Sequence, residues 1–303
     1  MRQKSVLKLL TIMFLILGIG FSFVFAQSYA QQNVEVIRTA TSADGTVINY
    51  YEHGQEGSVL VFVHGWSCDA SYWREQVAYF KHKYHKVLID LAGHGRSGSG
   101  RENYTMEAFG QDVKAVVDTI GAEKVVLIGH SMGALIIAHA ARLMPERVVG
   151  LIAVDDLQNV EYPLGEEQFK EMTTPFKEDF KQGVRGFVTG MLRSDNSPVN
   201  EWVISDMSSA DPKVAISAMN GSLGGYLTGD VAKLFDGLDV PVVAVNSDLW
   251  PTDAEANRRH IKNFELIELD GMDHFLMLKA PERFNPALEQ AVKMLLKKNK
   301  SAL

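Results

Sequence analysis

The prediction of the fold rests on one stretch of the sequence, Val125-Val126-Leu127-Ile128-Gly129-His130-Ser131-Met132-Gly133. An apolar run of strand type ends in a Gly-x-Ser-x-Gly motif, and an alanine-rich stretch of helix type, residues 134–141, follows at once. The two glycines allow a turn that is too tight for a Cβ atom, and such a turn holds its serine in a strained conformation. The motif therefore predicts that Ser131 lies at the tip of a strand-to-helix turn, where a histidine can reach its hydroxyl.

Strand-type and helix-type segments alternate on both sides of this turn. The alternation predicts an α/β fold, a mostly parallel, twisted sheet of the eight-stranded type with helices on both faces. An antiparallel hairpin turning at Asp44-Gly45 precedes the parallel part. The predicted strands cover 34–40, 46–52, 58–63, 86–90, 125–128, 148–154, 240–246 and 265–269, and the predicted core helices cover 71–81, 106–120, 134–141 and 281–298.

The strand rhythm stops between about Leu157 and Asp230. Charged segments of helix type fill this interval, so we predict a helical lid at 157–230, inserted into an α/β core made of residues 31–156 and 231–303. The alternative is that these helices are further layers of the core. The apolar side chains of the interval would form either an acyl pocket or the lid's own core: Phe169, Met172, Phe176, Phe180, Phe187, Met191, Met207 and Met219.

The first thirty residues are typical of an export signal. Basic residues precede an apolar run from Leu9 to Phe25, and small residues that suit a signal peptidase end at Ala26 or Ala30. We predict a signal peptide at 1–30 and a periplasmic or secreted protein. The alternative is an uncleaved anchor, which would be the chain's only contact with a membrane. The single cysteine, Cys68, leaves no internal disulfide to stabilise an exported domain.

Composition and missing motifs exclude several classes of function. The net charge is −7 with a pI of about 5.7, so no basic face for nucleic acid is expected. The chain has no dinucleotide-binding Gly-x-Gly-x-x-Gly motif, no phosphate-binding Walker loop and no His or Cys cluster with metal spacing. We therefore predict no cofactor and no metal.

Three further motifs accompany the Ser131 turn. They are His64-Gly65-Trp66, the loop Gly93-His94-Gly95-Arg96-Ser97, and Asp273-His274-Phe275 before the last helix. In this order the four motifs resemble those of lidded, single-domain α/β-hydrolases, and the resemblance covers nearly everything after residue 33. It implies a triad of serine, acid and histidine. A serine nucleophile excludes dehalogenases and epoxide hydrolases, which resemble one another in having an aspartate there.

The resemblance assigns roles to four residues. Ser131 would be the nucleophile, and His274, which follows a predicted strand and a short loop, would be its base. The geometry of the turn makes the Met132 backbone N–H one donor to the oxyanion. The resemblance makes the Trp66 N–H the other donor.

The acid of the triad is left open by the sequence. Counting forward from the strand that follows the lid, the position where the family keeps its aspartate holds Trp250, whereas counting back from the next helix it holds Asp248. In some relatives the acid lies at the end of the preceding strand, and Asp155 would then serve. Asp253 and Asp156 are further alternatives.

These patterns predict a serine hydrolase that cleaves small or medium carboxylic esters through an acyl-enzyme intermediate. The same site would also suit a lactonase, a C–C hydrolase, an aminopeptidase or a perhydrolase, since the fold hosts many activities. From another class, the lidded pocket could serve a binding protein for small molecules.

Overall fold

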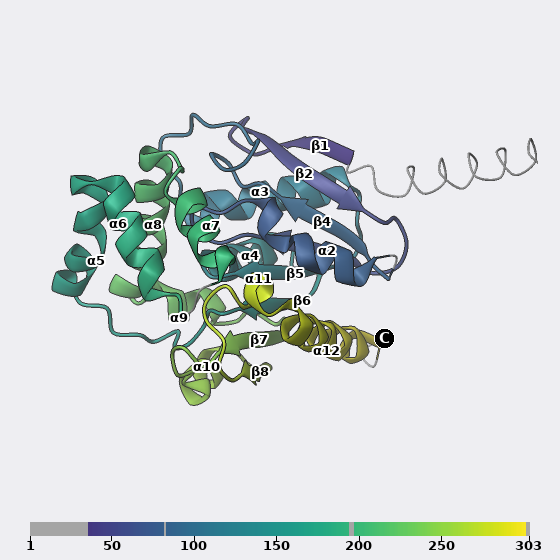
Figure 1. Ribbon diagram of the computed structural model, residues 1–303. Coiled ribbons are helices and arrows are strands. Elements are labelled where there is room, and N and C mark those ends of the chain that lie inside the picture. Colours follow the sequence, from purple (N-terminus) through teal and green to yellow (C-terminus); the bar gives the residue numbers. More distant parts are fainter. Residues whose placement is uncertain (1–35, 82, 194–196, 301–303) are drawn as a thin grey trace, which may run out of the picture. The chain divides into compact units, whose positions relative to one another are not determined.

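A computed structural model describes residues 36–81, 83–193 and 197–300 (Figure 1). The chain divides into two compact units, Met1–Val36 and Ile37–Leu303. The predicted signal peptide lies outside the described residues, so export stays a prediction. Among the helices that are described, none has the length and apolar character needed to cross a bilayer.

Eight strands form one sheet in the order β1-β2-β4-β3-β5-β6-β7-β8. Strand β2 pairs antiparallel with β4, and the pairs from β4 through β8 are parallel. The predicted fold class is confirmed. The strands are β1 (Val36–Thr41), β2 (Val47–His53), β3 (Val59–Val63), β4 (His85–Ile89), β5 (Val125–His130), β6 (Val148–Val154), β7 (Val242–Ser247) and β8 (Phe264–Leu269).

The carboxyl ends of the central strands finish level with one another. The register pairs Val63 with Gly129, His130 with Val154, and Val154 with Val245. All six residues of β5 are buried, as expected for a strand covered on both faces. The loops after β3, β5, β6 and β7 therefore leave the sheet at one edge, which is where open parallel sheets place their ligand sites.

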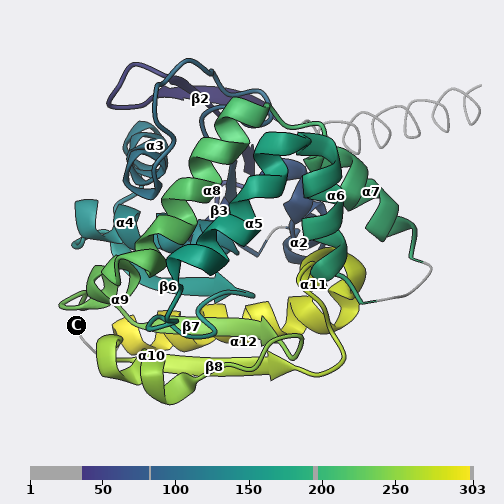
Figure 2. The ribbon, with the colours of Figure 1, turned by 90° about the vertical axis from the view of Figure 1, so that its left-hand side faces the viewer.

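Helices cover both faces of this sheet (Figure 2). Helices α3 and α4 pack against each other on one face, with α4 lying over β3, β5 and β6, whereas α12 lies over β6, β7 and β8 on the other face and contacts α2. Helix α3 buries an apolar stripe at helical spacing, whereas α4 is buried on nearly all sides. The core helices are η1 (Ala70–Trp73, a 3-10 turn), α2 (Arg74–Phe80), α3 (Met106–Thr119), α4 (Met132–Leu143), α10 (Ala254–His260), α11 (Leu276–Lys279) and α12 (Pro281–Lys300).

Five helices lie between β6 and β7, where the sequence predicts a lid, and we call them the helical insertion (Figure 1). Their packing joins α5 to α6 and α8, and α6 to α7. Helix α8 continues through Gly221, where a Cβ would lie 3.3 Å from the Tyr104 carbonyl oxygen. The insertion comprises α5 (Glu166–Glu178), α6 (Phe180–Gly190), α7 (Pro198–Met207), α8 (Pro212–Leu227) and α9 (Asp230–Phe235).

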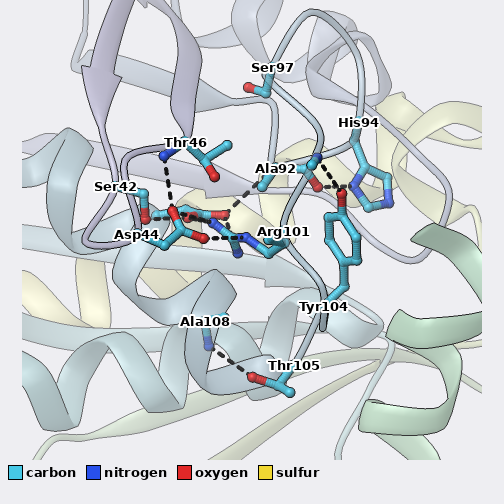
Figure 3. Close-up of polar contacts among 12 residues, drawn as sticks. Ser42, Asp44, Thr46, Ala92, His94, Ser97, Arg101, Tyr104, Thr105 and Ala108 are labelled. Carbon is cyan, nitrogen blue, oxygen red and sulfur yellow. Dashed lines mark hydrogen bonds and ion pairs between the residues drawn. The ribbon is translucent and has the colours of Figure 1, made fainter. Parts of the chain in front are cut away.

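A buried arginine ties the edge hairpin to the rest of the sheet (Figure 3). Arg101 forms ion pairs with Asp112 of α3 at 2.6 Å and with Asp44 of the β1–β2 turn at 2.8 Å. Asp112 also accepts hydrogen bonds from the Ser42 hydroxyl and the Ala92 amide. A buried carboxylate needs such partners because desolvation of an unpaired charge is costly. This network fixes the loop after β4, which contains His94, against α3.

Candidate active site

Ser131 occupies the sharp turn between β5 and α4. Its φ is 51° and its ψ is −128°, a conformation that non-glycine residues rarely adopt. A Cβ on Gly129 would lie 2.3 Å from the Gly133 carbonyl oxygen, and a Cβ on Gly133 would lie 2.7 Å from that of Val63. Both motif glycines are therefore required sterically. The Ser131 side chain caps no helix N–H and is partly exposed, so its hydroxyl is accessible.

His274 follows β8 and faces the carboxylate at the end of β6. Its Nδ1 lies 2.7 Å from Asp155 Oδ2, and both side chains are buried. The other Asp155 oxygen accepts a 2.6 Å hydrogen bond from the Ser247 N–H. Burial alone would raise the pKa of Asp155, but His274 and Ser247 outweigh it and hold the pKa below its usual value. Asp155 is thus an anion that presents one oxygen to the imidazole.

Of the alternatives left open for the acid, Asp248 is not placed in contact with His274. The Asp248 carboxylate lies at the surface, where it forms a 2.6 Å ion pair with Arg193. The Gly271 amide and Arg193 lower its pKa. Asp253 caps the first turn of α10 through the Ala256 N–H, and Asp156 accepts a hydrogen bond from the Leu157 N–H. Of the four candidate aspartates, Asp155 is the one in contact with His274.

Three neighbours, to which the sequence assigned no role toward His274, contact this residue. His130 Nε2 lies 2.9 Å from the His274 carbonyl oxygen and donates to it, since a carbonyl cannot donate. The His274 N–H donates to the Met191 carbonyl at 3.2 Å, and the Trp250 ring lies edge-on with its centroid 5.6 Å away. Burial lowers the pKa of His130 to about 3, so this ring is neutral. A main-chain acceptor such as Met191 leaves no signal in the sequence.

Trp66 and Met132 line the same cavity as Ser131. Met132 is the first residue of α4, so its N–H has no acceptor within the helix. A Cβ on Gly65 would lie 3.3 Å from Ser131 Cβ, so this glycine lets the Trp66 loop approach the serine closely. The Trp66 indole donates a 2.7 Å hydrogen bond to the Ala215 carbonyl of α8. The loop is therefore anchored to the helical insertion.

Ser131, His274 and Asp155 line one cavity of about 710 Å³ between the sheet edge and the helical insertion. Of the apolar side chains proposed for an acyl pocket, five line this cavity: Met172, Phe187, Met191, Met207 and Met219. Phe176 packs instead on Trp66, with ring centroids 5.1 Å apart, and belongs to the core of the insertion. Some of these apolar residues therefore line the cavity, as an acyl pocket would require, while Phe176 forms part of the insertion's own core.

Among the described residues, neither a cysteine nucleophile nor a metal site is supported. Cys68 lines the cavity, but burial raises the pKa of its thiol, which keeps it protonated. Within the described ranges, no three His, Cys, Asp or Glu side chains are grouped as a metal site.

Comparison with known proteins gives the class to which this fold and site belong. The model of the alpha/beta hydrolase family matches residues 60–287, and the chain belongs to that family. A non-heme chloroperoxidase of Streptomyces lividans is 27% identical over 84% of this chain and 99% of its own length. The 3-oxoadipate enol-lactonase 2 of Acinetobacter baylyi is 25% identical over 83% of this chain and 95% of its own length. The chain is accordingly an enzyme of the hydrolase class.

Solved structures agree on the fold. A thermophilic esterase from Thermogutta terrifontis superposes with a TM-score of 0.74 at 22% identity, covering 87% of this chain and 99% of that one. At this level of identity the likeness is one of fold.

Proposed function

We propose that this chain is a serine-dependent hydrolase that cleaves small or medium carboxylic esters through an acyl-enzyme intermediate. The observation that carries the proposal is the buried 2.7 Å contact of His274 Nδ1 with Asp155, in the cavity that also holds the strained, accessible Ser131. This contact leaves Nε2 of His274 as the ring nitrogen available to a serine hydroxyl. Asp155, rather than Asp248, is proposed as the acid.

In the first half of the reaction, His274 Nε2 takes the proton of Ser131 as Oγ attacks the ester carbonyl carbon. The negative charge that develops on the carbonyl oxygen is accepted by the N–H groups of Trp66 and Met132. Asp155 fixes the imidazole tautomer and stabilises the imidazolium without taking the proton. His274 then gives its proton to the departing alkoxide, which leaves as the alcohol, and the acyl group stays on Ser131.

In the second half, His274 takes a proton from a water molecule, whose oxygen attacks the acyl carbon. The tetrahedral intermediate collapses, Ser131 Oγ regains the proton from His274, and the carboxylic acid is released. A lactone is a cyclic ester, so the same steps would open it. The enol-lactonase among the relatives favours lactones as the second candidate substrate class.

The test is hydrolysis of a series of p-nitrophenyl esters by the protein from Gln31 onward. We expect loss of turnover in Ser131→Ala and in His274→Ala, with burst release of p-nitrophenol in the wild type when deacylation is slow. A fluorophosphonate probe should label the wild type and not Ser131→Ala. If the purified protein hydrolyses no ester or lactone in a Ser131-dependent way, the proposal is wrong.

A further inference from the structure

The cavity that holds Ser131 and His274 is lined by carboxyl groups and, among the described residues, by no permanently cationic side chain. Along the described parts of the chain, its lining includes Asp155, Asp156 and Asp253 but neither lysine nor arginine. Asp155 is occupied by His274 and the Ser247 N–H. Asp156 is different, because among the described residues its one hydrogen bond comes from the Leu157 N–H, at 2.6 Å, and it has no cationic partner.

Asp156 lies next to the reacting groups. It follows Asp155 at the end of β6, is partly buried, and lines the cavity with Ser131 and His274. The charged or titratable groups that act on it are Asp155, His274 and, from α8, Tyr226. Burial raises the pKa of Asp156 to about 7, although the Leu157 N–H and His274 act in the other direction. The carboxyl group is therefore mainly ionised above pH 7.

Aromatic rings accompany this carboxyl group in the cavity lining. Tyr226 meets Tyr162 edge-on, with ring centroids 6.4 Å apart, and Trp250 lies beside His274. Tyr162 is 44% exposed and Trp250 is 38% exposed, so these two rings lie where the cavity meets solvent. The faces of tyrosine and tryptophan rings attract organic cations.

We propose that Asp156 makes this cavity selective by charge, favouring acyl substrates that carry an ammonium group and disfavouring those that carry a carboxylate. The inference rests on the proposed function, because it concerns the substrate class of the same site. A substrate ammonium would meet the Asp156 carboxylate and the aromatic rings. A substrate carboxylate would lose its hydration shell next to the negatively charged aspartates of the cavity. No arginine or lysine of the lining would compensate for that loss.

The experiment compares substrates of matched chain length that carry a positive, a neutral or a negative end group. On the acyl side they are the p-nitrophenyl esters of γ-trimethylammoniobutyrate, of its neutral tert-butyl isostere, and of glutarate. On the alcohol side they are the choline ester of butyrate and the ester of the corresponding neutral tert-butyl alcohol. Ratios of kcat/KM between substrates cancel every factor that all the substrates share, including their common dependence on His274 as the base.

In at least one series at pH 8, we expect kcat/KM for the ammonium ester to exceed that for the neutral ester about tenfold. The glutarate ester should fall about tenfold below the neutral one. Asp156→Asn, which has the same shape and keeps an acceptor for Leu157, should bring these ratios within about threefold of unity. Lowering the pH to 6 should narrow the wild-type ratios, since Asp156 gains a proton there. The matched control is Asp239→Asn, which removes one charge at an exposed site and should leave every ratio unchanged.

A binding measurement separates this inference from the chemistry. Titration calorimetry on Ser131→Ala should show binding of benzyltrimethylammonium and weaker or absent binding of phenylacetate, and the Asp156→Asn change should remove the difference. Ser131-dependent turnover of the neutral ester without any charge preference would overturn the inference and leave the proposed function intact. Equal binding of the two ligands would overturn it as well, whatever the ester assays show.

Discussion

The sharpest prediction concerns Asp155→Asn, which changes one atom of the His274–Asp155 contact. Oδ1 of residue 155 accepts from the Ser247 N–H, and an asparagine in the same orientation keeps that bond only if its oxygen stays there. Its NH2 group must then face His274 Nδ1 and donate to it. The imidazole would be held as the Nε2–H tautomer, which cannot accept a proton from Ser131. The variant therefore removes both the charge and the correct tautomer.

The size of the effect follows from the geometry. Two unit charges 2.7 Å apart attract each other by about 6 kcal/mol at an effective dielectric constant of about 20. Each 1.36 kcal/mol corresponds to about tenfold in rate, so the imidazolium formed in the transition state loses about four decades of stabilisation. This agrees with the loss of about 10⁴ in kcat that is typical when the acid of such a triad becomes an amide.

The assay is steady-state hydrolysis of p-nitrophenyl butyrate, with thermal melts to show that the variant is folded. Asp248→Asn is the matched control, because it makes the same chemical change in a surface ion pair with Arg193, and such pairs contribute about 1 kcal/mol or less. We expect its kcat to stay within about threefold of the wild type. A folded Asp155→Asn protein that keeps more than a tenth of wild-type kcat would show that Asp155 is not the acid of the triad. A large loss in Asp248→Asn would return the acid to that residue.

Three further predictions concern stability and the His274 loop. Burial lowers the pKa values of three histidines, His64, His94 and His130, to about 3 or 4. Below pH 6.5 the unfolded chain therefore binds more protons than the native protein, and the free energy of unfolding should decrease by up to about 4 kcal/mol for each unit by which the pH falls. Urea melts should show this decrease, and His94→Gln should reduce its slope by about a third. Gly133→Ala should lower Tm sharply or prevent folding, because its Cβ would meet the Val63 carbonyl. The control is Gly186→Ala, whose Cβ would meet nothing within 4 Å, and it should stabilise the folded protein by roughly 0.5–1 kcal/mol. Arg193→Ala should lower kcat several-fold with little change in KM, because Arg193 donates to the Met272 carbonyl beside His274; an unchanged kcat would show that this tether is dispensable.

The sheet and the Ser131 turn could be predicted because their signals are local. Apolar strand runs, the Gly-x-Ser-x-Gly spacing and the alanine-rich helix each lie within a few residues of what they specify. The sterics of Gly129 and Gly133 follow from the same short stretch. The fold class therefore follows from patterns read within single segments.

The acid could not be chosen from the sequence, because the choice depends on side-chain direction at two neighbouring strand ends. Asp155 and Asp248 follow β6 and β7, which are adjacent and parallel, so both lie near the edge that carries His274. Asp155 takes a positive φ of 48° and is oriented by the Ser247 N–H, while Arg193 of the insertion engages Asp248. Contacts between segments this far apart in the chain have no signature in the spacing of residues.

The hydrogen bond from the Trp66 indole to the Ala215 carbonyl has a consequence for how substrate size affects the reaction. The same residue whose backbone N–H is proposed to stabilise the oxyanion is fastened through its side chain to α8. Movement of α8 to admit or release a bulky acyl chain would strain or break this bond and displace the N–H donor. Contacts of the substrate with the methionines of the insertion, far from the scissile bond, would thus help to hold the Trp66 N–H in line with the oxyanion. Substrates trimmed at that remote end should then lose turnover number as well as affinity.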